Sequence, residues 1–398
     1  MTKITNDIGR SKDFETLTGN CLQIFSLREL QTKLKETRPL RVKLGIDPTT
    51  PDIHLGHTVT LSKLRQFQEA GHESILIIGD FTAMIGDPTR RLDARQQLSY
   101  EETMSNALTY QRQAFKILDQ EQTRVVYNSQ WFRTMSLEKI MYLNSRFTVQ
   151  QILQREDFRN RINQGLPIRF QEIQYPILQG WDSVQVLADI ELGGTDQLFN
   201  IMMGRYLQKG EGQPQQVAML LPLLEGLDGI QKMSKSLNNT IGISETPESM
   251  FGKLMSIPDA ITNRYYKLLL CASPPPSSTH PMEVKKELAR RIVSKYHSQS
   301  AAESALENFN LRFSKRRLEC VELPCYTLAK GSYDPVSIVI SVYSKCFGMQ
   351  KSRGEVRRLI KQGSVQWRGE KMANPHVQFS FDASGILKLD RMHAVHLK

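Results

Sequence analysis

The chain has 398 residues, of which 40% are hydrophobic and 23% charged, a globular composition that excludes wholesale disorder. The longest apolar stretches, such as residues 217–224, are far shorter than the roughly 20 residues that a membrane helix needs, and the N-terminus lacks the apolar core of a signal peptide. The five cysteines do not follow a zinc-binding spacing. We therefore expect a soluble, cytoplasmic protein with no membrane partner and no protein-bound metal.

Positive charge gathers toward the C-terminal end of the chain. The formal net charge is +11. Residues 281–398 hold 21 basic and 11 acidic side chains, whereas residues 1–280 hold 31 and 30. This asymmetry suggests a near-neutral body with a basic C-terminal part that meets a polyanion. A solvated lysine-rich surface would give the same charge count, so charge alone does not decide.

The first part of the chain predicts a parallel β-sheet. Residues 40–46 and 74–79 are typical of short, largely buried strands. Between them, residues 55–70 carry apolar side chains at the spacing of an amphipathic helix, which Gly71 closes. A strand, a helix and a second strand in this order form a βαβ unit. We therefore expect an α/β fold with helices on the faces of a parallel sheet.

The rest of the chain predicts further strands and several helical parts. Two strands are expected at residues 123–127 and 188–192, and the second leads through a Gly193-Gly194 turn into a helix over 195–207. The other predicted parts are a mainly helical insertion over 130–187, a helical stretch over 245–318 broken at Pro258 and Pro274-Pro275-Pro276, a linker over 319–335, and a small basic unit over 336–398.

The loop between the first strand and its helix is the first candidate site. It reads GIDPTTPDIHLGH over residues 45–57. A loop that leads from a parallel strand into a helix N-terminus binds anions, because free N–H groups and the positive helix dipole point at the ligand. His54 and His57 can donate hydrogen bonds to a phosphate, and Gly56 lets a flat base approach the backbone. Such a histidine pair can equally bind a metal or lie unused on a surface.

A second candidate site is the segment Lys232-Met233-Ser234-Lys235-Ser236, which follows the apolar run 217–224 and a glycine-containing turn. Two lysines in a flexible loop can close over a pyrophosphate leaving group and neutralise the charge that develops in the transition state. Taken alone, a KxxK spacing carries little information, because most such lysines are solvated surface residues.

The two motifs in this order, HLGH and then KMSKS, resemble the class I aminoacyl-tRNA synthetases, whose corresponding elements hold ATP from two sides. Over about residues 28–398 the chain is similar to the bacterial tyrosyl-tRNA synthetases, in the subgroup with a lysine, here Lys43, before a Leu-Gly-Ile-Asp-Pro segment. The blocks that carry this similarity are GDFTAMIGDP at 79–88, YPILQGWDS at 175–183, ELGGTDQLFN at 191–200 and PLLEGLDGIQKMSKS at 222–236.

This resemblance implies that the protein activates L-tyrosine with ATP, accompanied by Mg²⁺, and transfers tyrosine to tRNA(Tyr). The implied catalytic residues are His54, His57, Lys232, Lys235, Arg91 and Arg95. The implied ATP-binding residues are Gly45, Asp47, Thr49, Gly56, Thr60, Gly194, Asp196, Met233, Ser234 and Ser236. The implied tyrosine-binding residues are Lys43, Asp87, Tyr175, Gln179, Asp182 and Gln197, with Asp182 at the phenol and Asp87, Tyr175 and Gln179 at the ammonium.

The resemblance also implies a division of labour along the chain. Residues 1–231 form a Rossmann-like catalytic domain, and its insertion at about 130–187 is expected to be the interface of a homodimer. Residues 232–318 contain the KMSKS loop and a helical anticodon-binding domain. After the linker, residues 336–398 form a small α+β S4 RNA-binding domain. There a basic helix carries the residues expected to grip phosphates: Arg353, Arg357, Arg358 and Lys361.

Two positions depart from the family's pattern. Arg90 stands where a glycine is usual after Gly86-Asp87-Pro88, and Trp181 replaces the tyrosine of a QGYDS segment. We expect Arg90 to alter the loop backbone and Trp181 to reshape the pocket wall.

Two other functions stay open at this point. One is a paralogue that delivers the adenylate to an acceptor other than tRNA, against which the basic C-terminal half argues. The other is an RNA-binding regulator without catalysis, against which the intact HLGH and KMSKS motifs argue.

Overall fold

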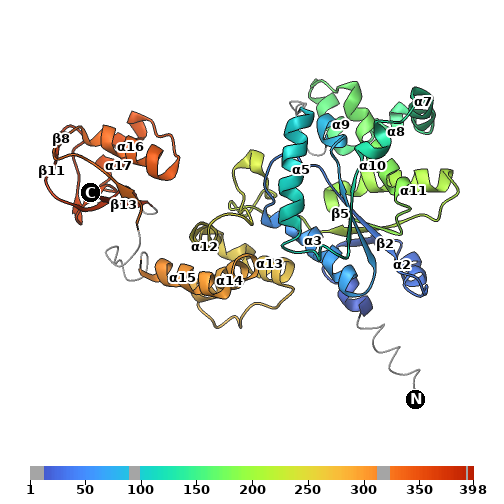
Figure 1. Cartoon of the computed structure of the whole chain (residues 1–398), viewed down its shortest axis with the longest axis horizontal. Coiled ribbons are helices and arrows are strands. Elements are labelled where there is room, and N and C mark those ends of the chain that lie inside the picture. Colours follow the sequence, from blue (N-terminus) through green and yellow to red (C-terminus); the bar gives the residue numbers. More distant parts are fainter. Residues whose placement is uncertain (1–12, 89–98, 312–322, 391–392) are drawn as a thin grey trace, which may run out of the picture. The chain divides into compact units, whose positions relative to one another are not determined.

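The computed structural model describes residues 13–88, 99–311, 323–390 and 393–398. The chain divides into two compact units, Met1–Glu303 and Ser304–Lys398, which we describe one at a time (Figure 1). In the described part of the chain, no helix is both long and apolar enough to cross a membrane.

A six-stranded sheet forms the centre of the first unit, in the order β1-β6-β5-β2-β3-β4. All neighbouring strands are parallel except β1 and β6, which pair antiparallel at one edge. The strands are β1 (Gln23–Phe25), β2 (Arg41–Ile46), β3 (Glu73–Ile78), β4 (Thr123–Tyr127), β5 (Ile190–Gly194) and β6 (Val217–Leu221). The predicted α/β fold with a parallel sheet is confirmed.

The helix that follows β2 matches its prediction within one residue. α3 (Leu55–Glu69) buries Leu61 and Leu64 completely, as the apolar spacing predicted. The chain then turns at Gly71, whose φ of +83° lies in the region that glycine adopts without strain. The loop between β2 and the start of α3 contains the first motif, which thus lies at the carboxyl end of β2.

The turn after β5 comes later than the sequence predicts. Gly193 and Gly194 are extended and pair with Leu220 and Leu221 of β6, so β5 runs through them. The chain turns in the 3₁₀ segment η1 (Thr195–Gln197) and continues as α11 (Leu198–Gly210). Pairing with a neighbouring strand thus overrides the turn preference of two glycines.

Helices fill the connections of the sheet. The β1–β2 connection contains α2 (Leu27–Lys33), and the β3–β4 connection contains α4 (Thr82–Ile85) and α5 (Tyr100–Ala114). The insertion between β4 and β5 is helical, as predicted, and contains α6 (Ser129–Phe132), α7 (Leu137–Ser145), α8 (Val149–Leu153), α9 (Glu156–Asn163) and α10 (Phe170–Gln185). α10 and α11 lie side by side (Figure 1). Their approach needs Gly180, because a Cβ there would lie 2.9 Å from the backbone nitrogen of Gly204.

Four more helices follow the KMSKS segment. They are α12 (Pro247–Ser256), α13 (Asp259–Leu270), α14 (Pro281–Tyr296) and α15 (Gln299–Phe309). The breaks come at the predicted prolines, since Pro258 caps the start of α13 and Pro274-Pro275-Pro276 lies between α13 and α14. α14 is tied to α3, where Nζ of Lys295 lies 3.5 Å from Oγ of Ser62.

The second unit has a core of its own, in which α16 (Pro335–Phe347) and α17 (Arg353–Lys361) pack against strands. A five-stranded sheet has the order β10-β9-β12-β13-β7, and β11 pairs with β8. The strands are β7 (Cys325–Tyr326), β8 (Gly331–Tyr333), β9 (Gln366–Trp367), β10 (Glu370–Lys371), β11 (Phe379–Phe381), β12 (Gly385–Lys388) and β13 (Ala394–Leu397).

Part of the expected linker over 319–335 belongs to this second unit. β7 pairs with β13 and β8 pairs with β11, so residues 325–333 are held in its sheets, and the expectation of a linker there is corrected. Strands of two or three residues are too short to produce a periodic pattern in the sequence.

Candidate active site

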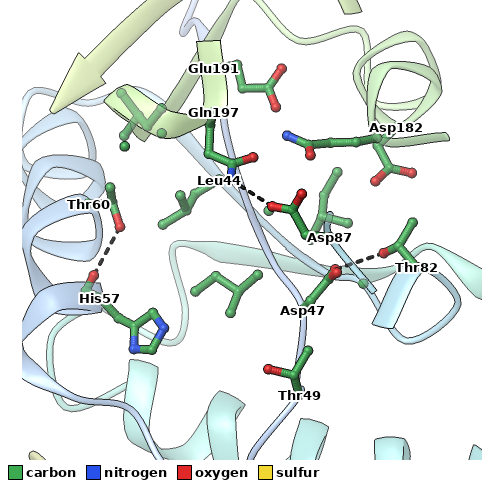
Figure 2. Close-up of a pocket in the computed structure, with 18 of the residues that line it drawn as sticks. Leu44, Asp47, Thr49, His57, Thr60, Thr82, Asp87, Asp182, Glu191 and Gln197 are labelled. Atoms are coloured by element: carbon green, nitrogen blue, oxygen red, sulfur yellow. Dashed lines mark hydrogen bonds between the residues drawn. The ribbon is translucent and has the colours of Figure 1, made fainter. Parts of the chain in front are cut away.

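A cavity of about 310 Å³ opens at the carboxyl ends of β2, β3 and β5. Ligand sites of parallel sheets are typically found at this edge. The predicted site residues that line it are Gly45, Asp47, Thr49, His57, Thr60, Asp87, Tyr175, Gln179, Asp182, Gly194, Gln197 and Lys232. Figure 2 shows His57 and Thr60 on one side of the cavity and Asp87 and Asp182 on the other.

Asp47, just after β2, is fixed from two sides. Its Oδ1 accepts a hydrogen bond from Thr82 (2.8 Å) and its Oδ2 accepts one from the hydroxyl of Tyr175 (2.9 Å). Gly79 lies so close that a Cβ there would be 2.1 Å from Oδ1, so a larger residue would displace the carboxylate. Asp47 therefore links Thr82 to Tyr175 at the wall of the cavity.

The two histidines of HLGH stack on each other at the start of α3, with ring centroids 3.9 Å apart. Nδ1 of His54 accepts the Gly56 N–H (3.2 Å), and Nδ1 of His57 accepts the His54 N–H (3.3 Å). Burial and the charges of Lys235 and Lys232 lower the pKa of His57 to about 4, and burial lowers the pKa of His54 as well. Both rings are therefore neutral with the proton on Nε2, and each offers one N–H donor.

The lysines of KMSKS are paired with carboxylates on the two flanks of this histidine pair. Nζ of Lys232 lies 2.8 Å from Oδ2 of Asp196, which follows β5. Nζ of Lys235 lies 3.0 Å from Oδ2 of Asp52, which precedes the first histidine. The loop thus brings two ammonium groups to the N-terminus of α3, the end predicted to bind phosphates.

Backbone pairing holds the chain on both sides of the KMSKS loop. Met233 is buried, and its N–H donates to the Leu224 carbonyl. After the loop, His54 forms a β-bridge with Gly242. Gly56 lies against this loop: a Cβ there would be in ordinary contact with Cβ of Met233 at 3.5 Å, but only 3.0 Å from the imidazole of His54.

The remaining loop residues are held by side-chain hydrogen bonds. The Ser234 N–H donates to Oδ1 of Asn239 (2.8 Å), and the Ser234 and Ser236 hydroxyls lie 3.0 Å apart. These contacts fix the middle of the loop beside its two lysines.

The far end of the cavity is built around Asp182 on α10. Its carboxylate accepts hydrogen bonds from Nε1 of Trp131 (3.0 Å) and Nδ2 of Asn128 (3.3 Å). Burial raises its pKa to about 7, and the charge of Lys43 and the two hydrogen bonds oppose this shift. Asp182 is thus a buried acceptor that is held in place by donors from the segment after β4.

Polar side chains between the two ends are also organised. Asp87 accepts a hydrogen bond from Nε2 of Gln197 (2.8 Å), and the guanidinium of Arg155 lies 3.7 Å from its other oxygen. Gln179 lines the cavity with a buried Oε1 that has no hydrogen-bond partner among the described residues. A buried acceptor without a partner is costly, so it marks a position where a ligand donor is expected.

Two predicted features of the site differ in the structure. Lys43 lies beneath the cavity and does not line it, since its Nζ pairs with Oε1 of Glu191 at 2.8 Å. Trp181 is buried in the core around α10, with the ammonium of Lys139 over its ring, and does not line the cavity either. The expected change of the pocket wall by Trp181 is therefore corrected. Arg90, Arg91 and Arg95 lie outside the described residues.

Sequence reasoning missed four residues of the site: Asn128, Trp131, Arg155 and Asp52. Asn128 and Trp131 follow β4, and the carboxyl ends of parallel strands meet at one edge, so their place in the chain was a usable signal. Arg155 lies in the insertion and Asp52 inside the first motif, and no local pattern marks either one.

The candidate RNA-binding residues lie on α17 of the second unit. Val356 and Ile360 face its core, and Arg357, Arg358 and Lys361 are exposed. None of these three has an ion-pair partner among the described residues. Arg353 differs, because its guanidinium is paired with Asp334 at 2.8 Å.

Comparison with known proteins shows the family of this chain. The sequence profile of the tRNA synthetases class I (W and Y) matches residues 35–314. The tyrosine–tRNA ligase of Carboxydothermus hydrogenoformans is 49% identical over 91% of this chain and 91% of its own length. The tyrosine–tRNA ligase of Desulfotalea psychrophila is 44% identical over 96% of this chain and 97% of its own length.

The fold also matches that of solved structures. A C-terminally truncated mitochondrial tyrosyl-tRNA synthetase from Aspergillus nidulans superposes with a TM-score of 0.60, covering 77% of this chain and 100% of that one at 18% identity. At this identity the likeness concerns the fold alone. Together with the profile and the near-full-length relatives, it leads to one conclusion: the chain belongs to the tRNA synthetases of class I (W and Y).

Proposed function

We propose that this chain is a tyrosine–tRNA ligase, which activates L-tyrosine with ATP to tyrosyl-adenylate and transfers tyrosine to the 3′ end of tRNA(Tyr). The observation that carries the proposal is one cavity with two chemically different ends. Asp182 and Asp87 at one end suit a phenol and an ammonium group. His57 and Lys232 at the other end suit a polyphosphate. The relatives named above support this choice of amino acid.

The first reaction is an in-line attack of the tyrosine carboxylate on the α-phosphorus of ATP. One P–O bond forms, the bond to pyrophosphate breaks, and no covalent intermediate with the enzyme is needed. Catalysis then consists of positioning the two substrates and stabilising the leaving pyrophosphate. We assign the stabilisation to Lys232 and Lys235, with Arg91 and Arg95 from residues outside the described part of the chain.

The histidines act as neutral donors in this scheme. Because Nδ1 of His54 and of His57 is occupied by a backbone N–H, the Nε2–H of each ring can donate to a phosphate oxygen. The lysines must exchange their present partners, Asp196 and Asp52, for phosphate oxygens as the loop closes. Asp196 is then released to accept hydrogen bonds from the ribose hydroxyls.

The other nucleotide contacts come from backbone that the loops expose. Gly45, Thr49, Thr60 and Gly194 line the cavity beside the histidines. Mg²⁺ is expected to enter as a complex with ATP. We assign it no protein ligand.

At the amino-acid end, Asp182 accepts the phenol hydroxyl, and Asp87, Tyr175 and Gln179 surround the ammonium. The unpartnered Oε1 of Gln179 supports this assignment, since an ammonium group supplies the missing donor. Gln197 faces the reacting carboxylate.

The second unit is proposed to be the S4 RNA-binding domain and α12–α15 the anticodon-binding region. Exposed Arg357, Arg358 and Lys361 on one helix support phosphate contacts. A cytoplasmic location belongs to the same proposal, because tRNA charging serves translation.

The protein is also proposed to be a homodimer that joins through the helical insertion. Large apolar side chains stand exposed there, which supports a protein interface: Leu137, Met141, Val149, Ile162 and Phe170.

Two assays test the function. Tyrosine-dependent exchange of pyrophosphate into ATP reports the first step, and charging of tRNA(Tyr) reports the second. Exchange without charging would favour a paralogue with another acceptor. Binding of tRNA without exchange would favour an RNA-binding regulator.

A further inference from the structure

A buried ion pair lies beneath the amino-acid end of the cavity. Lys43 of β2 and Glu191 of β5 are register partners in adjacent parallel strands, and their side chains meet with an Nζ–Oε1 distance of 2.8 Å. Lys43 is completely buried and Glu191 is 1% exposed. A charge removed from water to this extent is tolerated only when it is paired and hydrogen-bonded.

The remaining bonds of the pair lead to α10. Lys43 Nζ also donates to Oγ of Ser183 (2.7 Å) and to the Gln179 carbonyl (3.1 Å). Oε2 of Glu191 accepts from the Ser183 hydroxyl (2.9 Å) and from the amide of Gln216. An ammonium group has three donors, and all three of Lys43 are used, so Lys43 has none left for a substrate.

The two contact points on α10 flank Asp182. Gln179 and Asp182 line the cavity, whereas Lys43 does not. Lys43 can therefore act on the site only through the backbone of α10 and through its charge, whereas Glu191 lines the cavity. A change at Lys43 would shift the position of Asp182 or favour its protonated form, without removing any group that touches the substrate.

The charges around Asp182 make the Lys43 ammonium important for the protonation state of this carboxyl group. The acidic groups that share the cavity with it are Asp47, Asp87 and Glu191, and the phenol of Tyr175 faces it as well. Among the described residues, Lys43 is the cation with a direct effect on the Asp182 charge, and Asn128 and Trp131 add neutral donors. Burial and Asp47 favour the protonated form of Asp182, and Lys43 favours the carboxylate.

We propose that the Lys43–Glu191 pair is a positioning and specificity element of the amino-acid pocket, which holds residues 179–183 in place and keeps Asp182 in the carboxylate form that prefers a phenol to a phenyl ring. This inference rests on the proposed function. It assigns Lys43 a role behind the pocket instead of at the substrate, and it gives Glu191 a role that the sequence did not suggest.

The test is the pH dependence of kcat/KM for tyrosine in pyrophosphate exchange, measured on the full-length protein on both sides of neutral pH. In the wild type, protonation of Asp182 should produce a fall on the acid side. In the double variant Lys43→Met/Glu191→Gln this fall should move to higher pH by about one unit, a tenfold loss at a fixed acidic pH. The double variant is needed because Lys43→Met alone would leave Glu191 buried and unpaired.

The single variant Glu191→Gln gives an opposite prediction. It keeps the Lys43 cation and removes its nearest anion, so the fall should move to lower pH. This variant is isosteric and tests the inference even where the double variant does not fold. Lys33→Met is the matched control: Lys33 is a buried lysine 3.4 Å from Asp189, outside the cavity, and Asp189 retains Arg38 and Arg41. It should leave the pH profile unchanged.

Phenylalanine and ATP provide the remaining readouts. Preference for tyrosine over phenylalanine should fall in the double variant at acidic pH, and KM for ATP should stay constant. Equal shifts of the acid-side fall in Lys43→Met/Glu191→Gln and in Glu191→Gln, or no shift in either variant, would overturn the inference. A wild-type protein that does not activate tyrosine would instead overturn the proposed function itself.

Discussion

Lys235→Ala separates transition-state stabilisation from substrate binding. Lys235 is paired with Asp52 at 3.0 Å, and the two side chains are 28% and 50% exposed. An exposed pair of this kind contributes about 0–1 kcal/mol to folding, so the variant should remain folded. Its ammonium group lies close enough to lower the pKa of both His54 and His57, and therefore lies at the phosphate end of the cavity.

The expected catalytic loss is much larger than the loss of stability. Removing one charged contact to a leaving group costs about 3 kcal/mol, on the order of 100-fold in rate. Single-turnover adenylate formation should fall by this factor, while tyrosine affinity should change little. Lys286→Ala is the control, because Lys286 pairs with Glu283 at 2.9 Å on α14, and its removal deletes a partly exposed ion pair outside the site. Equal losses of rate and of tyrosine affinity in Lys235→Ala would refute the role in the transition state.

Three further changes test other parts of the site. Asp182→Ala should lower kcat/KM for tyrosine by at least about 100-fold, because the phenol, Asn128 and Trp131 all lose their acceptor; near-normal exchange would contradict the assignment. A chain ending after Phe309 should activate tyrosine at nearly the full-length rate but charge tRNA poorly. Its tRNA binding should depend less on salt, and the slope of log affinity against log salt concentration should fall by about one unit for each lost phosphate contact. Unchanged charging would exclude RNA contacts by the second unit. The pKa of His57 is lowered from 6.5 to about 4 in the folded state. Between these two pH values the unfolded state therefore binds more protons than the folded state, and the free energy of unfolding should fall as the pH drops through this window. His57→Gln should flatten this fall in urea titrations, and an unchanged pH dependence would argue against a buried neutral ring.

The sequence predicted the sheet because β2 and β3 are largely buried and α3 between them has a clear apolar stripe. The positions of β2, β3 and α3 came within one residue, whereas β1 at the sheet edge was not predicted. The turn after β5 did not, because pairing of Gly193 and Gly194 with β6 is a tertiary effect that no local pattern encodes. The expected linker over 319–335 was wrong for a similar reason: β7 pairs with β13, which lies about 70 residues further along.

The candidate site divides in the same way. Residues inside the HLGH and KMSKS segments could be named from their motifs, and His57 and Lys232 among them line the cavity. The residues that position them could not. Asn128 and Trp131 hold Asp182 from another element, Arg155 reaches Asp87 from the insertion, and Asp52 pairs with Lys235 from a distant part of the chain. These contacts depend on how segments meet in space, which spacing along the chain does not contain.

Exchange of labelled pyrophosphate into ATP, with tyrosine added or omitted, tests the central claim most directly. We predict exchange that requires tyrosine and is followed, on addition of tRNA(Tyr), by charging of its 3′ end. Exchange that is absent with tyrosine, or that proceeds equally well with an unrelated amino acid, would contradict the assignment of the cavity as a tyrosine-activating site.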